Sequence, residues 1–239
     1  MVTLTDRTKP AIDSRDVAIH SSDAILPGIL SIPPQPSGLV LFAHGSGSSR
    51  FSKRNQLVAD VLHKSGIATL LFDLLTPEEE KIDAADESLR FDISLLTHRL
   101  TGAIDWLGEV SRHRGVELGL FGASTGAAAA LNAAASRPDQ VRAVVCRGGR
   151  PDLAPGALHR VSSPTLMIVG GKDFPVLRLN RQAAARMTAP HSLLVVPGAN
   201  HLFEEPGTLR QAADLATEWF QRYLNPSPLL QRTLRSGVR

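Results

Sequence analysis

Leu118-Gly-Leu-Phe-Gly-Ala-Ser-Thr-Gly-Ala-Ala-Ala-Ala130 is the stretch that decides the fold of this 239-residue chain. A short apolar run, 116–121, ends in Gly-Ala-Ser-Thr-Gly, and an alanine-rich segment of high helical propensity follows at once. The pattern predicts a strand, a sharp turn and a helix, with Ser124 at the apex of the turn. A strained turn of this kind needs small residues two positions away on either side, and Gly122 and Gly126 supply them.

The predicted turn has a chemical consequence. It would hold the Ser124 hydroxyl clear of the sheet and direct the backbone N–H of Thr125 toward a developing oxyanion, where the helix N-terminus adds favourable potential. A G-x-S-x-G pattern also arises by chance in glycine-rich connections between a strand and a helix. The rest of the chain must therefore decide whether Ser124 is a nucleophile.

Strands and helices alternate on both sides of this turn. The first two predicted strands read as an antiparallel hairpin, and the alternation after residue 38 is typical of a parallel sheet covered by helices. The acidic stretch 74–87 is expected to be a loop. The predicted strands are 15–20, 24–32, 39–43, 67–73, 116–121, 141–146, 165–170 and 192–196, and the predicted helices are 53–65, 89–112, 125–136, 174–187 and 209–223.

This order of elements predicts an α/β protein. We expect a mostly parallel, twisted sheet with an N-terminal antiparallel hairpin, helices on both faces and no large cap domain. A single domain over 14–225 would be flanked by a loose arm over 1–13 and a mobile tail over 226–239.

Composition narrows the classes of function. No apolar run approaches the roughly 20 residues that span a bilayer, and the first residues contain no signal-peptide core, so no membrane partner is expected. The net charge of +3 comes from scattered basic side chains without interleaved aromatics, which argues against nucleic-acid binding. Cys146, the only cysteine, is expected to be buried and inert, and its isolation favours a reducing cytoplasm.

Three chemically useful residues follow three predicted strands. Ser124, Asp173 and His201 each come just after a strand, and the carboxyl ends of parallel strands gather at one edge of the sheet. A serine hydroxyl needs a base to accept its proton, and a histidine serves as that base when an acid fixes its tautomer. The chain order of serine, acid and histidine is the one expected of an α/β-hydrolase.

Each of these residues has an alternative interpretation. Asp173 precedes a predicted helix and could serve only as its N-cap. His201 could be a loop histidine bonded to the backbone. Asp152, which also follows a strand, is an alternative acid for the triad.

A fourth motif, His44-Gly-Ser-Gly47, follows the first long parallel strand. Its small residues would let a backbone N–H reach the oxyanion beside that of Thr125, with Ser46 as the first candidate donor and Gly47 as the second. The competing interpretation, a phosphate-binding loop, lacks the Gly-Lys-Ser/Thr ending that such loops carry. His44 is expected to fix this loop by hydrogen bonds and not to act as a base.

Together, His44-Gly-Ser-Gly47, Gly122-Ala-Ser-Thr-Gly126, Gly171-Lys-Asp173 and Asn200-His201 resemble the α/β-hydrolase superfamily over residues 24–225. Within it, the chain is similar to the small dienelactone hydrolase-related branch. Dienelactone hydrolases use a cysteine nucleophile where this chain has Ser124, so the resemblance implies a serine esterase that needs no metal or organic cofactor. The resemblance extends to hydrolase domains that occur beside phosphoribosyltransferase domains, and we expect no such domain within these 239 residues.

The expected activity is hydrolysis of small carboxylic esters by Ser124, His201 and Asp173 through an acyl-enzyme. A thioesterase or peptidase would use the same residues, and a non-catalytic binding protein on the same scaffold is the alternative from another class. The expected partner is a small-molecule ester, and a homodimer is left open. The expected walls of the substrate pocket are 74–87, Phe174, Leu202 and Phe203.

Two arginines that follow the predicted strand 141–146 could place positive charge near the predicted site. Arg147 or Arg150 could attract an acidic group of the substrate. In the alternative interpretation, both arginines form ordinary surface salt bridges.

Overall fold

The computed structural model describes residues 11–225, with the side chains of 109–114 left out. The expected tail over 226–239 lies outside the described residues, as does most of the expected arm. The first strand begins at Asp13, two residues before the predicted start.

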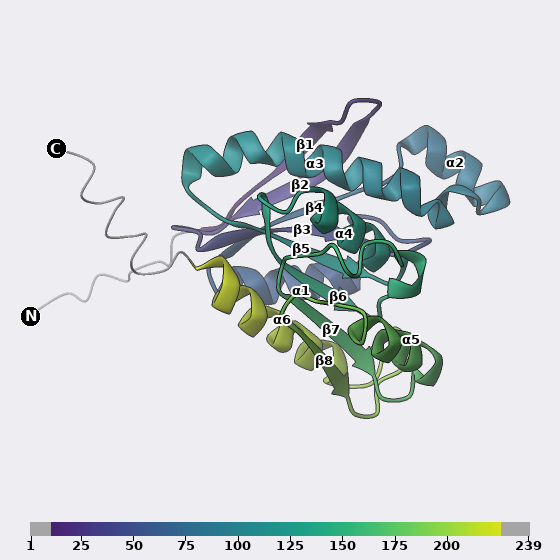
Figure 1. The fold of residues 1–239 in the computed structure, drawn as a ribbon. Helices are drawn as coiled ribbons and strands as arrows, with labels where there is room; N and C mark the ends of the chain where they lie inside the picture. The colour runs from purple at the N-terminus through teal and green to yellow at the C-terminus, as the bar shows by residue number, and fades with distance from the viewer. Residues whose placement is uncertain (1–10, 226–239) are drawn as a thin grey trace, which may run out of the picture.

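An eight-stranded sheet forms the centre of the molecule, in the order β1-β2-β4-β3-β5-β6-β7-β8 (Figure 1). β1 and β2 form the predicted antiparallel hairpin, β2 pairs antiparallel with β4, and all the remaining pairs are parallel. The α/β-hydrolase fold expected from the sequence is therefore confirmed. The strands are β1 Asp13–His20, β2 Ile25–Ile32, β3 Gly38–Ala43, β4 Ile67–Phe72, β5 Leu118–Ala123, β6 Val141–Arg147, β7 Thr165–Gly170 and β8 His191–Val196.

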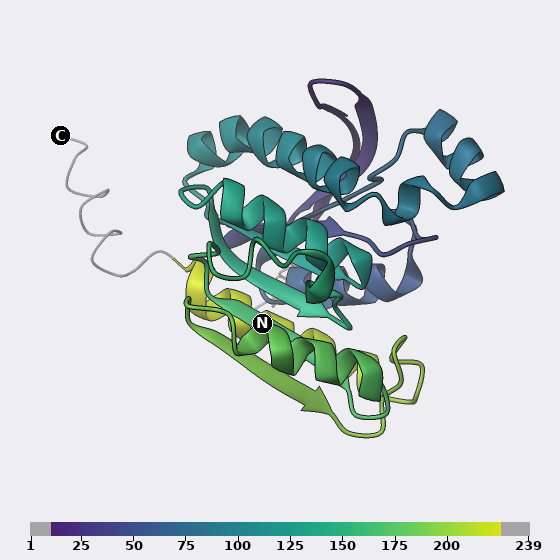
Figure 2. The same ribbon diagram turned by 45° about the vertical axis from the view of Figure 1, so that its right-hand side comes forward.

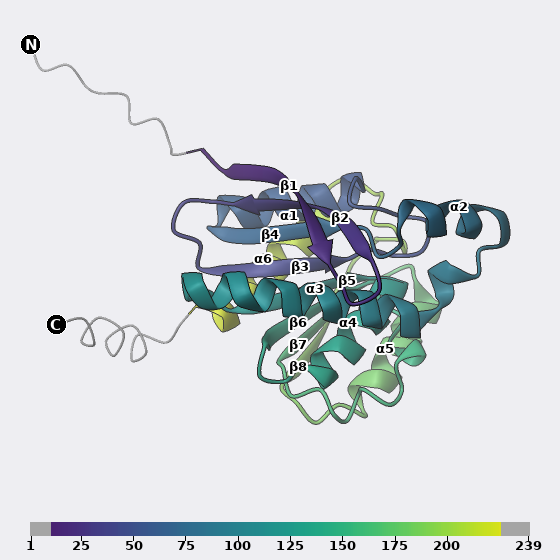
Figure 3. The same ribbon diagram turned by 90° about the horizontal axis from the view of Figure 1, so that it is seen from above.

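Helices cover both faces of this sheet (Figures 1 and 3). α1 and α6 pack on one face, and α3, α4 and α5 pack on the other. Two single 3₁₀ turns, Leu89–Phe91 and Pro151–Leu153, lie in the connections. The helices are α1 Lys53–Lys64, α2 Pro77–Asp86, α3 Ile93–Arg114, α4 Thr125–Ser136, α5 Phe174–Ala184 and α6 Thr208–Leu224.

The two cores follow from the two-residue period of the strands. In β3, Leu39 and Leu41 belong to the core under α3 and α4, whereas Val40 and Phe42 belong to the core under α1 and α6. The alanines of α4 are almost all fully buried, so this helix packs closely on β5 and β6. Close packing there fixes the start of α4, where the Ser124 turn lies.

The prediction of a loop over 74–87 is wrong, because this stretch contains the helix α2. Thr76 and Glu79 form a capping box in which each side chain accepts from the other residue's backbone N–H, at 3.2 and 2.8 Å, and Pro77 takes the first helical position. The acidic run lacks an apolar stripe, so periodicity gave no signal, although the capping sequence Thr-Pro-Glu-Glu was present. Figure 2 shows α2 projecting at the periphery of the molecule.

The long helix after α2 also starts later than predicted. α3 begins at Ile93, and residues 89–91 form the separate 3₁₀ turn. The Asp92 side chain accepts a hydrogen bond from the backbone N–H of Leu95 at 2.9 Å, as an N-cap residue does. This cap explains the shifted boundary.

Candidate active site

Ser124 occupies a strained turn between β5 and α4. Its backbone angles, φ 51° and ψ −118°, lie in a region that costs a non-glycine residue about 1–3 kcal/mol. The end of β6 holds the turn in place, because the Ser124 N–H donates to the Arg147 carbonyl at 3.2 Å and the Arg150 N–H donates to the Ser124 carbonyl at 3.1 Å. Strain of this kind persists only where neighbouring structure enforces it, which marks Ser124 as a candidate functional residue.

The glycines on either side of Ser124 leave no room for a side chain. A Cβ atom on Gly122 would lie 2.5 Å from Cα of Ala127, and one on Gly126 would lie 2.5 Å from the His44 carbonyl oxygen and would also overlap that of Ala43. The backbone approaches closely on both sides of Ser124, and this explains the predicted requirement for small residues at positions 122 and 126. At Gly126 the obstacle is the end of β3, where the His44–Gly47 loop begins.

Gly126→Ala is expected to destabilise the fold by about 1–3 kcal/mol, because two backbone carbonyls would have to move to admit the methyl group. Urea unfolding followed by circular dichroism measures this change. Gly156→Ala is the matched control, since a Cβ atom there meets nothing within 4 Å and its unfolding midpoint should stay near that of the wild type. Equal midpoints for the two variants would contradict the close approach at Gly126.

His201 and Asp173 lie in direct contact. Nδ1 of His201 is 2.6 Å from Oδ2 of Asp173, and the aspartate side chain is only 9% exposed. Asp173 stands at the N-cap position of α5, but its side chain makes no capping hydrogen bond. The interpretation of Asp173 as a mere cap is therefore excluded, and its carboxylate is free to orient the imidazole.

The alternative acid, Asp152, is engaged elsewhere. Its two carboxylate oxygens accept hydrogen bonds from Arg150 at 2.8 and 2.7 Å. Its partner is thus an arginine two residues away, whereas Asp173 contacts the histidine directly.

Ser124 and His201 line the same cavity, which has a volume of about 160 Å³. Gly148, at φ 53°, passes beneath the His201 ring, and a Cβ atom there would lie 3.4 Å from the ring atoms Nδ1 and Cε1. Sequence reasoning missed the part of the wall that comes from the serine-rich loop and the start of α1, although both follow directly from the His44 motif. The other residues that line the cavity are Gly45, Ser46, Ser48, Ser52, Arg54, Asn55, Ala123, Arg147 and Leu202.

Of the predicted oxyanion donors, Ser46 lines this cavity, and Thr125 directly follows Ser124 in the chain. Thr125 is the first residue of α4, where a backbone N–H has no acceptor within the helix. The Ser46 N–H makes no backbone hydrogen bond within residues 11–225. Gly45 brings the loop close to the nucleophile, because a Cβ atom on it would lie 3.1 Å from Cβ of Ser124. Gly47, the second candidate donor, lines a neighbouring cavity and not that of Ser124.

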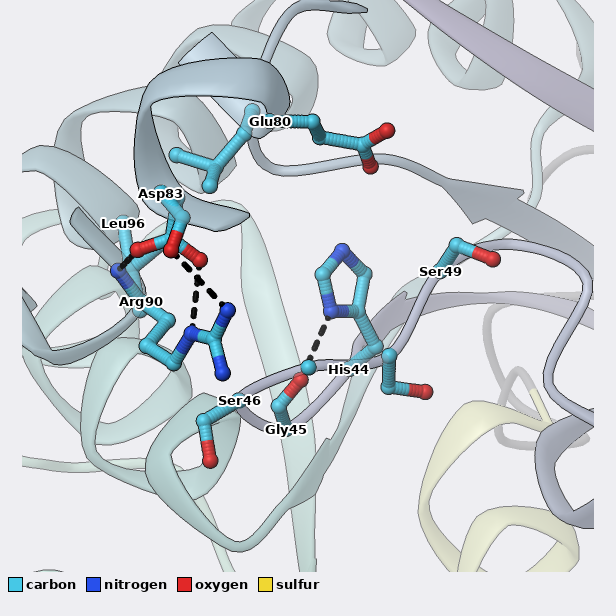
Figure 4. A pocket seen from close by; sticks show the side chains of 11 residues that line it. His44, Gly45, Ser46, Ser49, Glu80, Asp83, Arg90 and Leu96 are labelled. Atoms are coloured by element: carbon cyan, nitrogen blue, oxygen red, sulfur yellow. Dashed lines mark hydrogen bonds and ion pairs between the residues drawn. The ribbon is translucent and has the colours of Figure 1, made fainter. Parts of the chain in front are cut away.

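The neighbouring cavity has a volume of about 280 Å³ and shares Gly45, Ser46 and Ser48 with the first. Its far wall consists of Glu80 and Asp83 from α2 and of Arg90, opposite the His44–Ser49 loop (Figure 4). The segment 74–87 was expected to form a wall of the substrate pocket. It lines this second cavity instead, mainly through the helix α2, and none of its residues lines the Ser124 cavity.

Charges around the larger cavity are partly compensated. Nε of Arg90 donates to Oδ2 of Asp83 at 2.6 Å, and this partner helps to lower the pKa of Asp83 against the opposing effect of burial. Burial, followed by the charge of Asp73, raises the pKa of Glu80.

His44 is fixed by hydrogen bonds, as the sequence predicts. Its Nε2 accepts from the Leu74 backbone N–H at 3.1 Å, and its Nδ1 lies 3.0 Å from the Gly45 carbonyl oxygen (Figure 4). Burial lowers the pKa of His44. A neutral ring with the proton on Nδ1 satisfies both contacts, so His44 ties the loop to the segment after β4.

The remaining predicted substrate residues separate into different environments. Leu202 lines the Ser124 cavity, but Phe203 is 2% exposed and belongs to the core under α1 and α6. Phe174 is 69% exposed and lines neither cavity. Arg150 pairs with Asp152, as in the salt-bridge interpretation, whereas Arg147 is buried at the wall of the Ser124 cavity.

Cys146 is buried, as predicted, and burial raises the pKa of its thiol to about 12. In the part of the chain that the structure describes, no group of three or more histidine, cysteine, aspartate or glutamate side chains could hold a metal ion. No helix within residues 11–225 is long and apolar enough to cross a membrane.

Solved structures of other proteins share the fold of this chain. It is 54% identical to a dienelactone hydrolase from Anabaena variabilis, whose crystal structure matches with a TM-score of 0.87 over 89% of this chain and 99% of that one. A dienelactone hydrolase-like promiscuous phosphotriesterase from metagenomic libraries shares the fold at 17% identity, with a TM-score of 0.73 over 90% of this chain and 100% of that one.

A Mycobacterium tuberculosis protein named as a phosphoribosyl transferase is 52% identical over 220 residues, which are 92% of this chain and 49% of that protein. The chain therefore spans about half the length of the curated relatives it matches. The sequence profile of the dienelactone hydrolase family matches residues 26–225, which include the Ser124 turn, Asp173 and His201. Because this match extends over most of the chain, the protein belongs to the dienelactone hydrolase family.

Proposed function

We propose that this protein is a serine hydrolase that cleaves small carboxylic esters through an acyl-enzyme. One observation carries the proposal: Asp173 contacts Nδ1 of His201 at 2.6 Å, and His201 lines the same cavity as the strained Ser124. A serine and a histidine that share a cavity, with an aspartate in contact with the histidine, support the roles of nucleophile, base and orienting acid.

In the first step, the Oγ atom of Ser124 attacks the ester carbonyl carbon while Nε2 of His201 takes the hydroxyl proton. Asp173 accepts the hydrogen bond from Nδ1 and stabilises the imidazolium. The backbone N–H groups of Ser46 and Thr125 hold the negative oxygen of the tetrahedral intermediate. When the intermediate collapses, the alcohol leaves with the proton from His201, and the acyl group remains on Ser124.

In the second step, water replaces the alcohol. His201 takes a proton from the water as its oxygen attacks the acyl-enzyme, a second tetrahedral intermediate forms, and its collapse returns the proton to Ser124 and releases the carboxylic acid. Both steps use the same donors and the same base. The small volume of the Ser124 cavity, about 160 Å³, supports short acyl groups as substrates.

The test is the initial rate of hydrolysis of 4-nitrophenyl esters from acetate to decanoate, together with labelling by a fluorophosphonate probe. We expect the highest kcat/KM with the short esters, and labelling that maps to Ser124. A thioester and an anilide of the same short acid, assayed in parallel, test the thioesterase and peptidase alternatives. Absence of both turnover and labelling would favour the non-catalytic binding protein.

The mycobacterial relative named as a phosphoribosyl transferase matches this chain over 49% of its own length, so that name belongs to a protein about twice as long. The Ser124, His201 and Asp173 arrangement supports hydrolysis.

A further inference from the structure

Arg147 is a buried arginine in the wall of the Ser124 cavity. It is the last residue of β6, only 6% of it is exposed, and it lines the same cavity as Ser124 and His201. Burying a charged group is unfavourable unless it is paired, so buried arginines normally have an acidic partner. An acidic partner is therefore expected next to the Arg147 guanidinium.

No carboxylate compensates this charge. Among residues 11–225, Arg147 forms no ion pair, and its Nε is buried without a hydrogen-bond partner. Within the described residues, its one side-chain hydrogen bond runs from Nη2 to Oδ1 of Asn55 at 3.5 Å, which is a long contact. The ring of Phe203 lies 5.6 Å from the guanidinium carbon and contributes a weaker interaction.

Neighbouring arginines behave differently. Arg50 contacts Asp73, Arg90 pairs with Asp83, and Arg150 pairs with Asp152. The positive charge of each of these three arginines is therefore compensated by an aspartate. Arg147 differs from these three arginines, because no aspartate pairs with it among the described residues.

A second cation lies beside Arg147. Arg54, in the first turn of α1, lines the same cavity and forms no ion pair within the described part of the chain. Burial, followed by the charge of Arg54, lowers the pKa of Arg147 to about 10, so Arg147 is still a cation at neutral pH. Two like charges next to each other are unfavourable, and an anion between them would relieve both the repulsion and the unpaired Nε.

We propose that Arg147 and Arg54 bind an anionic group of the substrate, a carboxylate or a phosphate, next to the ester that Ser124 attacks. This inference rests on the proposed hydrolase function. A planar guanidinium can hold either group with two parallel hydrogen bonds. Because the cavity holds only about 160 Å³, the anionic group lies within a few atoms of the scissile ester.

The experiment compares two esters that differ only in charge, 3-acetoxybenzoate and its neutral methyl ester. The wild type is expected to favour the anionic ester in kcat/KM after each rate is divided by that of spontaneous hydrolysis. Arg147→Met, which keeps the length of the side chain and removes its charge, should lower this preference about 10- to 100-fold, the effect expected for losing a hydrogen bond between charged groups. Arg147→Lys should restore part of it.

Arg150→Met is the matched control, because Arg150 also follows β6 but is already paired with Asp152. Its preference should equal that of the wild type. Arg54→Met should lower the preference in the same direction as Arg147→Met, and it provides a test on a second element if Arg147→Met fails to fold. A third substrate, 3-acetoxyphenyl phosphate, shows whether the site favours phosphate over carboxylate.

A binding measurement separates this inference from the proposed function. Calorimetric titration of 3-acetoxybenzoate into Ser124→Ala should show binding that is lost when Arg147→Met is added. If neither ester is hydrolysed but this binding is seen and lost, the hydrolase proposal fails and the anion site stands. A wild type that treats both esters alike, or an unchanged preference in Arg147→Met and Arg54→Met, would overturn the anion site.

Discussion

Ser124→Ala is expected to lower kcat for 4-nitrophenyl acetate by about 10⁴- to 10⁶-fold, because the acyl-enzyme can no longer form. KM should change much less, since the methyl group of alanine leaves the cavity walls in place. The residual rate would come from the oxyanion donors and from substrate binding alone. Initial rates, with protein purified separately for each variant, measure the change.

The backbone of Ser124 adds a second readout to this prediction. Ser124→Gly should be equally inactive, but it should unfold with a free energy about 1 kcal/mol higher than that of Ser124→Ala, because glycine tolerates φ 51° and alanine does not. Urea unfolding of the two variants makes the comparison. Retention of more than a tenth of the wild-type rate in Ser124→Ala would contradict the role of Ser124 as nucleophile.

Asp173→Asn is expected to lower kcat by about 10⁴-fold. An amide cannot stabilise the imidazolium that forms when His201 takes the serine proton, and its NH₂ group would favour the wrong tautomer of His201. Among the described residues, Asp173 is the only carboxylate that forms an ion pair or a hydrogen bond with the His201 ring. The measurement is kcat for a short 4-nitrophenyl ester over a range of pH.

Asp152→Asn is the control for this prediction, since both aspartates follow strands of the same parallel sheet. Asp152 pairs with Arg150, so its loss should change stability slightly and leave kcat near that of the wild type. Near-normal turnover in Asp173→Asn together with a collapse in Asp152→Asn would move the role of the acid to Asp152.

Much of the fold could be predicted because its signals are local. A continuous apolar run such as that of β3 indicates a strand buried on both faces, and the glycines around Ser124 indicate a tight turn. α2 was missed because an acidic helix at the periphery has no apolar face to reveal it, and only its cap marked it. Periodicity detects the helices that pack on a sheet, and α2 is not one of them.

The sequence by itself determined the order of strands and helices, the Ser124 turn, and the placement of Ser124, Asp173 and His201 after three strands. These features depend on residues a few positions apart, or on the rule that parallel strands end at one edge. It favoured Asp173 as the acid but left Asp152 as an alternative, because the contact of His201 with Asp173 joins loops 28 residues apart.

Only the tertiary structure decided which of two residues close together in the sequence is buried, paired or exposed to the cavity. Leu202 lines the cavity while Phe203 is buried in the core, and Arg150 is paired while Arg147 is not. Arg150 finds its aspartate two residues along the chain, whereas Arg147 faces Asn55, which is 92 residues away. Which charge is compensated and which side chain reaches the cavity depends on contacts between distant segments, and those contacts exist only once the sheet and its helices have packed together.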